Sequence, residues 1–351
     1  MRKKLTIFLL ALSGLAEAGC YPNEYIDLRA SYPKAFKNIE IKNQGSYGLC
    51  YAYAGAMMID FNRMTQYQAG TSEISALQAG LLSSIHSESE SEEGGDICDV
   101  VNAVSKKGSI CSDSTIGREL AYKGLGEYFH AQVVQQVFMP FILREQEFKA
   151  VTPKQFTSRI GLNKVQKAYV ERFDAFYRLL KIEILKRGIV PANVPSALHS
   201  FKLAQNIHVN NRYSILGASF MESIINELCP NSAIKVPPMH CRTAKGSAYT
   251  LIGDLDHQIS SLKPVGISYC SIMLTNREET GLDYTGAHKK NCGEHASVII
   301  GRKSDKLGRC SYLIRNSWGE SSKYDWETSK GDIWVSEHQL KRNLFQVHVI
   351  E

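Results

Sequence analysis

The chain has 351 residues, of which 44% are hydrophobic and 22% are charged, and its formal net charge is +6. These proportions are typical of a water-soluble globular protein with a sizeable core, and the length fits one large domain or two ordinary ones. The positive charge is spread along the chain without a basic stripe, so we expect no nucleic-acid partner.

The first eighteen residues have the features of a secretory signal. Three basic residues precede an apolar stretch from Leu5 to Leu15, which is too short to span a bilayer. Small residues on either side of Glu17 form a cleavage site that ends at Ala18. We therefore expect a signal peptide over 1–18 and a secreted or periplasmic protein without integral membrane association. Lipoprotein anchoring at Cys20 is the alternative, although Glu17 stands where such a site needs an aliphatic residue.

A polar, glycine-containing loop from Asn43 to Leu49 leads into Cys50. Apolar residues then recur at helical spacing, at Ala54, Met57, Met58 and Phe61. The pattern predicts a helix that begins at Cys50 and places its thiol at the positive end of the helix dipole, which favours the thiolate. The preceding segment, 21–42, is expected to be mostly extended.

Further helices are expected at 72–84 and at 96–106, the second ending at Gly108. Five acidic residues lie between positions 86 and 96, where we expect an exposed loop. Strands are expected later in the chain, at 265–271, 297–302, 311–315 and 332–336.

Two later stretches carry further candidate catalytic residues, His295 within Gly-Glu-His-Ala and Asn316 within Arg-Asn-Ser-Trp-Gly. The order Gln44, Cys50, His295, Asn316 is the layout of a cysteine hydrolase, in which a histidine activates the thiol and a third group orients the ring.

The nine cysteines support export. All follow Ala18, and if Cys50 is a free nucleophile the other eight are enough for four disulfides in an oxidising compartment. The shortest separations favour Cys98 with Cys111 and Cys229 with Cys241, although spacing does not fix connectivity and buried thiols are the alternative. No spaced Cys and His set predicts a zinc site, and no metal or other cofactor is expected.

These motifs together resemble the papain-like cysteine proteases. The family's spacing of Gln and Cys is met by Gln44 and Cys50, its Asn-Ser-Trp-Gly motif is met from Asn316, and its paired glycines are met by Gly94 and Gly95. The resemblance covers roughly 21–111 and 245–351, and it is the occurrence of all the motifs in order that makes it specific.

The resemblance implies an α+β fold with a helical left lobe, an antiparallel β-barrel-like right lobe and an active site in the cleft between them. It implies an exported cysteine endopeptidase that forms a thioester acyl-enzyme. In that reading Cys50 is the nucleophile, His295 the general base and acid, Asn316 the residue that orients the imidazole, and Gln44 an oxyanion donor with the Cys50 backbone N–H.

The resemblance also implies residues that contact the substrate. Gly94 and Gly95 would pair with an extended peptide, the Glu294 carbonyl would accept a substrate N–H, Gly48 would line the site, and Trp318 would shield the bond between histidine and asparagine. The expected partners are protein or peptide substrates and a protein inhibitor, and the expected state is a monomer. The acidic loop beside the glycines suggests a preference for basic substrates, with a solvated loop as the alternative.

The chain departs from the family in two places. Leu49 replaces a small residue beside the nucleophile, and a disulfide that usually joins this loop to the paired glycines is absent. Cys50 also follows Ala18 so closely that no inhibitory prosegment fits between them. These departures keep two alternatives open: a catalytically silent papain-like binding scaffold, and a cysteine hydrolase or acyl transferase that acts on cell-wall peptides.

About 245 residues separate Cys50 from His295, whereas papain-like enzymes have roughly 130 to 150. We therefore expect about 100 extra residues between them. The expected division is a signal peptide at 1–18, a helical lobe at 19–111, a helical insertion at 112–244 and a β-rich lobe at 245–351. Within the insertion an apolar stripe predicts a helix from Lys164 to Arg187, capped by Asn163, and a second helix is expected at 215–228. The insertion is a structural addition packed on the helical lobe, a lid or built-in inhibitor that covers the cleft, or a module that binds a partner.

Overall fold

The computed structural model describes residues 20–44, 48–67, 70–86, 95–115, 151–168, 170–171, 229, 233–320, 323–329 and 331–351. The expected signal peptide, Gly94, most of the acidic loop and most of the expected insertion lie outside these residues. The helices are α1 (Leu28–Ser31), α2 (Pro33–Asn38), α3 (Cys50–Thr65), α4 (Ala76–His86), α5 (Ile97–Lys107), α10 (Pro153–Ser158), α14 (Ala248–Ser260), α15 (Ile272–Thr275) and α16 (Glu337–Lys341). The strands are β1 (Tyr25–Asp27), β2 (Ser109–Cys111), β3 (Ala233–Lys235), β4 (Cys241–Ala244), β5 (Val265–Cys270), β6 (Glu294–Ser304), β7 (Cys310–Arg315), β8 (Glu327–Ser329), β9 (Asp332–Ser336) and β10 (Leu344–Ile350).

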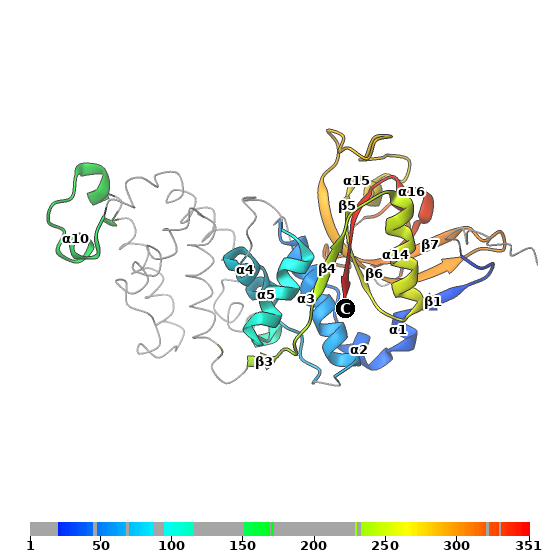
Figure 1. Ribbon diagram of the computed structural model, residues 1–351, viewed down its shortest axis with the longest axis horizontal. Helices are drawn as coiled ribbons and strands as arrows, with labels where there is room; N and C mark the ends of the chain where they lie inside the picture. The colour runs from blue at the N-terminus through cyan, green and yellow to red at the C-terminus, as the bar shows by residue number, and fades with distance from the viewer. Residues whose placement is uncertain are drawn as a thin grey trace, which may run out of the picture.

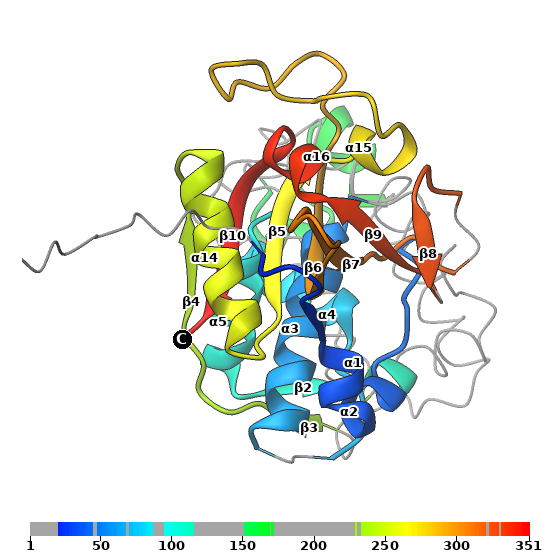
Figure 2. The ribbon, with the colours of Figure 1, turned by 90° about the vertical axis from the view of Figure 1, so that its right-hand side faces the viewer.

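Most of the strands form one antiparallel sheet, in the order β4-β10-β5-β6-β7-β9-β8 (Figure 2). β1 pairs with the far end of β6. The mixture of helices and antiparallel strands confirms the α+β class, and the four later strands expected from the sequence correspond to β5, β6, β7 and β9. In the described residues the sheet stays open between β4 and β8 and does not close into a barrel.

The sheet is covered on both faces, because apolar side chains alternate along its strands. On β6, Ala296, Val298 and Ile300 pack with α3 in one hydrophobic cluster. Ile299 packs on the opposite face with residues of α14. Figure 1 shows α3, α4 and α5 on one side of the sheet and α14 on the other.

The helices around α3 pack closely. A Cβ atom on Gly55 of α3 would lie 2.7 Å from a Val100 methyl carbon of α5, so the lack of a side chain there lets the two helices approach. The Asp96 carboxylate caps α5 by accepting from the Cys98 N–H, and Gly108 ends the helix with φ +75°. The expected helix at 96–106 is therefore confirmed.

The segment before Cys50 differs from the sequence expectation, which was mostly extended chain. Asp27 caps the short helix α1 through the Arg29 N–H, and Pro33 stands in the first turn of α2. Both residues are strong helix-start signals, and they override the extended reading. The helix expected at 72–84 begins later than expected, because the structure places it at Ala76–His86.

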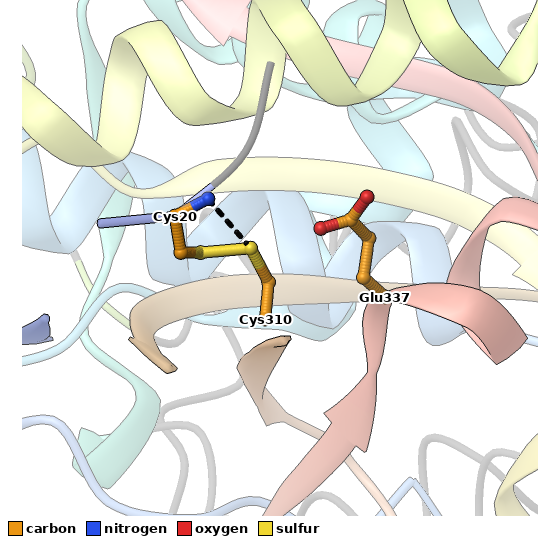
Figure 3. Close-up of side chains that lie close together, drawn as sticks. All are labelled: Cys20, Cys310 and Glu337. Atoms are coloured by element: carbon orange, nitrogen blue, oxygen red, sulfur yellow. Dashed lines mark hydrogen bonds between the residues drawn. A yellow bond between two sulfur atoms is a disulfide. The ribbon is translucent and has the colours of Figure 1, made fainter. Parts of the chain in front are cut away.

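The structure contains four disulfides, and their pairing corrects the local pairs expected from the spacing. Cys98 is joined to Cys241 and Cys111 to Cys229. Cys98 lies in the first turn of α5, and the rest of this helix, at about 1.5 Å per residue, separates it from Cys111. The other two pairs are Cys270–Cys292 and Cys20–Cys310; Figure 3 shows the latter beside Glu337.

The two ends of the expected insertion meet. β2 pairs with β3 so that Cys111 lies opposite Ala233, and the disulfide from Cys111 to Cys229 joins the same region. Of the helix expected at 164–187, residues 164–168 are described and helical, and the Asn163 carboxamide accepts from the Gln166 N–H, as expected of a cap. Residues 170–171 are also described and helical, and the other residues of that helix, like the helix expected at 215–228, lie outside the described residues.

Candidate active site

Cys50 is the first residue of α3, and of the nine cysteines it alone has a free thiol. The residue before it, Leu49, gives the helix no side-chain cap, so the first N–H groups of α3 remain near the thiol. Cys50 is 8% exposed. Its thiol is within hydrogen-bonding reach of the Ala296 backbone N–H on β6, which brings the helix and the sheet together at this point.

His295 stands next to Ala296 on β6, and its ring is held by Asn316. The His295 Nε2 atom lies 2.6 Å from the Asn316 Oδ1 atom. Because a carbonyl oxygen only accepts, Nε2 carries the proton of the neutral ring and Nδ1 has the free lone pair. Because of this hydrogen bond, the basic nitrogen of His295 is Nδ1, on the side of the ring away from Asn316.

Three aromatic rings surround this hydrogen bond. The Trp318 ring centre is 4.7 Å from that of His295, and the Tyr269 ring meets His295 edge-on at 5.5 Å. Tyr324 stacks on the outer side of Trp318 at 6.2 Å. Trp318 is thus placed where the sequence predicts a shield over the imidazole.

Burial shifts the pKa values of both the Cys50 thiol and the His295 imidazole. It lowers the pKa of His295 to about 4, although the Asn316 hydrogen bond acts in the opposite direction. Burial likewise raises the pKa of the Cys50 thiol, against the backbone N–H groups of Ala296 and Tyr51. The sequence predicts a thiol shifted toward thiolate by the helix dipole, whereas burial acts on the thiol pKa in the opposite direction.

Gln44 is held against the Asn316 segment. Its backbone N–H donates to the Ser317 carbonyl at 2.7 Å, and its side-chain oxygen accepts from the Ser317 hydroxyl. Because the oxygen is used there, the carboxamide end of Gln44 has a defined orientation. The predicted oxyanion residue therefore lies in the same buried cluster as Asn316.

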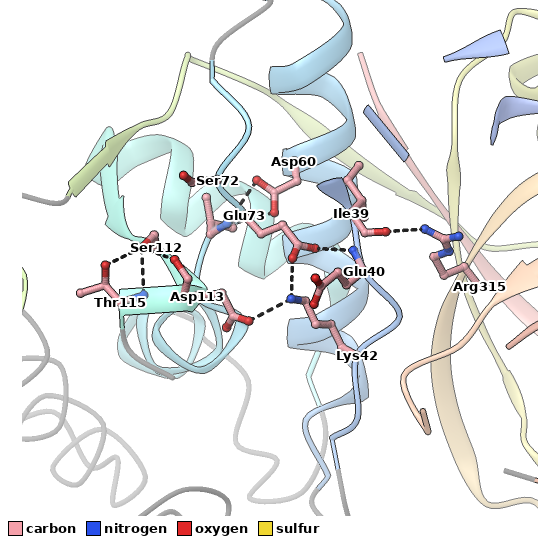
Figure 4. A network of polar contacts seen from close by, with 12 residues as sticks. Ile39, Glu40, Lys42, Asp60, Ser72, Glu73, Ser112, Asp113, Thr115 and Arg315 are labelled. Carbon is pink, nitrogen blue, oxygen red and sulfur yellow. Dashed lines mark hydrogen bonds and ion pairs between the residues drawn. The ribbon is translucent and has the colours of Figure 1, made fainter. Parts of the chain in front are cut away.

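A polar network fixes the chain just before Gln44 (Figure 4). The Lys42 ammonium contacts Glu73 at 2.5 Å and Asp113 at 3.0 Å, and the Glu40 N–H donates to Glu73 at 3.0 Å. Glu73 lies just before α4, and Asp113 lies just after β2. Two sets of contacts therefore fix the position of Gln44: those of Lys42 with Glu73 and Asp113, and those of Gln44 itself with Ser317, which follows β7.

The predicted substrate contacts are distributed as follows. Gly95 lies against the Tyr51 ring, since a Cβ atom there would be 2.5 Å from a ring carbon. Gly48 is exposed beside the start of α3. The Glu294 carboxylate is paired with His288 at 2.9 Å, so its side chain points to solvent rather than to His295. Gly94 lies outside the described residues.

Sequence reasoning missed three residues that contact this cluster: Tyr269, Ser297 and Tyr324. The Ser297 hydroxyl donates to Asn316 Oδ1 at 3.0 Å, and Asn316 Nδ2 donates to the Tyr324 hydroxyl at 3.2 Å. The one available signal is the polar Ser297 directly before the apolar run 298–300 of β6.

Two clusters of potential metal ligands occur in the described residues, and each depends on disulfide-bonded cysteine: Cys20, Cys310 and Glu337, and Asp96, Cys98 and His348. A disulfide sulfur is not a thiolate ligand. In the described part of the chain, no helix combines the length and apolar character that crossing a membrane requires.

Comparison with known proteins gave no matching family model and no matching curated protein. The chain is similar to the proform of the Amb a 11 cysteine protease of ragweed pollen (TM-score 0.42, 13% identity), covering 94% of this chain and 65% of that one. It is similar to xylellain, a cysteine protease from Xylella fastidiosa (TM-score 0.41, 15% identity), covering 95% of this chain and 91% of that one.

A third similar structure is SERA5E from Plasmodium falciparum (TM-score 0.46, 10% identity), covering 93% of this chain and 96% of that one. These neighbours are papain-like cysteine proteases, the family that the sequence motifs resemble. Identities this low concern fold alone, and the case for an activity rests on the residues of the site.

Proposed function

We propose that the chain is a cysteine peptidase that uses Cys50 as nucleophile and His295 as general base and acid. One arrangement carries the proposal: a free thiol at the start of α3 reaches the backbone beside His295, whose far nitrogen is bonded to Asn316. The same three residue types in this order are those of nucleophilic cysteine catalysis.

The chemistry follows from the ring orientation. With Nε2–H directed at Asn316, Nδ1 takes the proton of the Cys50 thiol as the sulfur attacks a peptide carbonyl. The tetrahedral intermediate then expels the amine, which receives this proton from His295, and a thioester remains. Water, deprotonated by the same nitrogen, hydrolyses the thioester and returns the thiol.

The oxyanion of each intermediate needs donors held in place before the reaction. The Cys50 backbone N–H and the Gln44 carboxamide N–H are the proposed pair. The fixed Gln44 oxygen at Ser317 supports this assignment, because it directs the amide nitrogen away from Ser317. Gly95 and the Glu294 carbonyl would bind the peptide backbone of the substrate.

Intact mass spectrometry after treatment with a papain-class epoxide inhibitor tests the proposal. We expect one adduct, mapped to Cys50, with loss of casein hydrolysis. His295→Ala should abolish the adduct, whereas the matched variant His257→Ala, an exposed histidine on α14, should keep it. A folded protein that forms no adduct and cleaves no protein would instead be a binding scaffold.

We also propose that the mature chain is exported after cleavage at Ala18. Four disulfides support an oxidising compartment. The Cys20–Cys310 bond needs an unmodified Cys20 sulfur, which a lipoprotein would not retain. N-terminal sequencing should find Gly19 first, and a blocked, lipidated Cys20 would contradict this. We further propose that the chain is divided as the sequence predicts, into a signal peptide at 1–18, a helical lobe at 19–111, an insertion at 112–244 and a β-rich lobe at 245–351.

A further inference from the structure

The Asn316 carboxamide has a partner at every polar position that the structure describes. Its oxygen accepts from His295, from the Ser297 hydroxyl and, at 2.9 Å, from the Ser317 backbone N–H. Its nitrogen donates to the Tyr324 hydroxyl. Asn316 is buried, so each of these bonds is protected from competition with water.

The hydroxyl groups of Tyr269 and Ser297 form a chain of two hydrogen bonds that ends at the Asn316 oxygen. The Tyr269 hydroxyl lies 2.9 Å from Ser297 Oγ, and Ser297 has a single proton, which goes to the acceptor-only oxygen of Asn316. Tyr269 must therefore donate to Ser297. Burial raises the pKa of Tyr269 well above its usual value, which keeps this donor protonated.

We propose that Tyr269, Ser297 and Tyr324 form a clamp that positions the Asn316 carboxamide for the base His295. This inference rests on the proposed function. Ser297 on β6 bonds the Asn316 oxygen, Tyr324 in the segment between β7 and β8 bonds its nitrogen, and Tyr269 on β5 holds the Ser297 hydroxyl. They restrict rotation about the last side-chain torsion of Asn316, which is otherwise broad.

The clamp matters because the amide determines which imidazole nitrogen is the base. If the amide rotated, His295 Nε2 would lose its acceptor, and the ring could carry its proton on Nδ1, where it could not deprotonate Cys50. The Ser317 N–H continues to hold the oxygen when a clamp hydroxyl is removed. Removal of one hydroxyl should therefore weaken catalysis without abolishing it.

Hydroxyl deletion tests the proposal. Ser297→Ala and Tyr324→Phe should each lower kcat about fivefold to tenfold, with little change in KM, since a buried hydrogen bond is worth about 1 kcal/mol. Tyr312→Phe is the matched control: it removes a buried hydroxyl bonded to Asp256 at 2.8 Å, away from the site, and should leave kcat unchanged.

The decisive measurement repeats both deletions in an Asn316→Ala background. If the hydroxyls act through Asn316, they should have no further effect on kcat there. An equal loss in both backgrounds, or no loss in the parent, would overturn the clamp. Thermal unfolding of each variant separates loss of folding from loss of positioning.

NMR of the histidine side-chain nitrogens reports the tautomer of His295 without requiring catalysis. It therefore tests the clamp separately from the proposed peptidase activity. The parent should show His295 as the Nε2–H form above pH about 4, identified by its loss in His295→Gln. The Ser297→Ala, Tyr324→Phe double variant should show a mixture of forms. An inactive parent with this tautomer shift would refute the peptidase and retain the clamp, whereas an active parent without it would refute the clamp.

Discussion

At the scale of single residues, burial favours the neutral forms of both the Cys50 thiol and the His295 imidazole. Both groups are buried, and the pKa of each moves in the direction that removes its charge. In the proposed mechanism, charge develops when the proton moves from Cys50 to His295. The hydrogen bonds to Asn316 are arranged to receive that charge on the ring.

The charge state gives a spectroscopic prediction. Thiolate absorbs in the ultraviolet and thiol does not, so the difference spectrum between the parent and Cys50→Ser should show no thiolate at pH 7. Thiolate should appear only at alkaline pH, because burial raises the Cys50 pKa. A full thiolate signal at neutral pH would show that the pair rests as an ion pair.

The proposed role of Gln44 gives a kinetic prediction. Gln44→Ala should lower kcat by about 100-fold, the usual loss when one oxyanion donor is removed, with little change in KM. Gln78→Ala is a matched control, since Gln78 is a buried glutamine whose side chain accepts from the Cys111 N–H at 2.8 Å. If both substitutions lowered kcat equally, Gln44 would not be an oxyanion donor.

At the scale of elements, strand pairing places a buried ion pair behind the site. Arg315 lies opposite Asp332 across β7 and β9, and its guanidinium contacts the carboxylate at 2.8 and 2.9 Å. Arg29 contacts the same carboxylate at 3.0 Å, and Arg315 also donates to the Ile39 carbonyl. The pair thus joins the sheet to the segment that leads to Gln44.

Removal of this carboxylate should be strongly destabilising. Asp332 is 0% exposed, and Asp332→Ala would leave the buried Arg315 guanidinium without its carboxylate, at about 3 to 5 kcal/mol of unfolding free energy, whereas Arg29 would keep its contacts with Asp27. Glu327→Ala, which removes an exposed pair with Lys303, should change it by less than about 1 kcal/mol. Urea unfolding measures both, and similar values would contradict the prediction.

The two disulfides beside α5 should be non-additive, because Cys111–Cys229 lies inside the loop closed by Cys98–Cys241. While Cys111–Cys229 is closed, Cys98–Cys241 closes a loop of only about 25 residues. Loss of Cys98–Cys241 alone should therefore lower the free energy of unfolding by about 3.5 kcal/mol. Loss of both should cost about 8 to 9 kcal/mol, because the full loop is then freed. The test is the free energy of unfolding of three variants: Cys→Ser at both ends of one disulfide, at both ends of the other, and at all four positions. Strictly additive losses would contradict the prediction.

At the scale of the whole molecule, His295 makes stability depend on pH. Its pKa in the folded chain is about 4, below the usual 6.5, so between these values the unfolded chain binds a proton that the folded chain does not. Stability should therefore fall as pH falls through this window, by about 3 kcal/mol in total. The parent should show this slope relative to His295→Gln, and parallel curves would contradict the lowered pKa.

The sequence was sufficient for the parts of the molecule that local patterns determine. Cys50, His295 and Asn316 each lie in a short motif, and the cap at Asp96 and stop at Gly108 are local signals. The contacts of Ser297 and Tyr324 with Asn316 depend on strand register and on a loop path, which no local pattern encodes. The Cys98–Cys241 pairing likewise depends on where the chain returns after the expected insertion, and the Cys50 charge depends on burial.

The nested disulfides have a consequence for a chain that has been cut. A protease nick anywhere between Cys111 and Cys229 would leave both products linked by Cys98–Cys241 and Cys111–Cys229. The molecule would then exist as a two-chain form that migrates as one species until it is reduced. Because Cys50 and His295 would lie on different products, such a form would still hold its thiol and its base together without a continuous backbone between them.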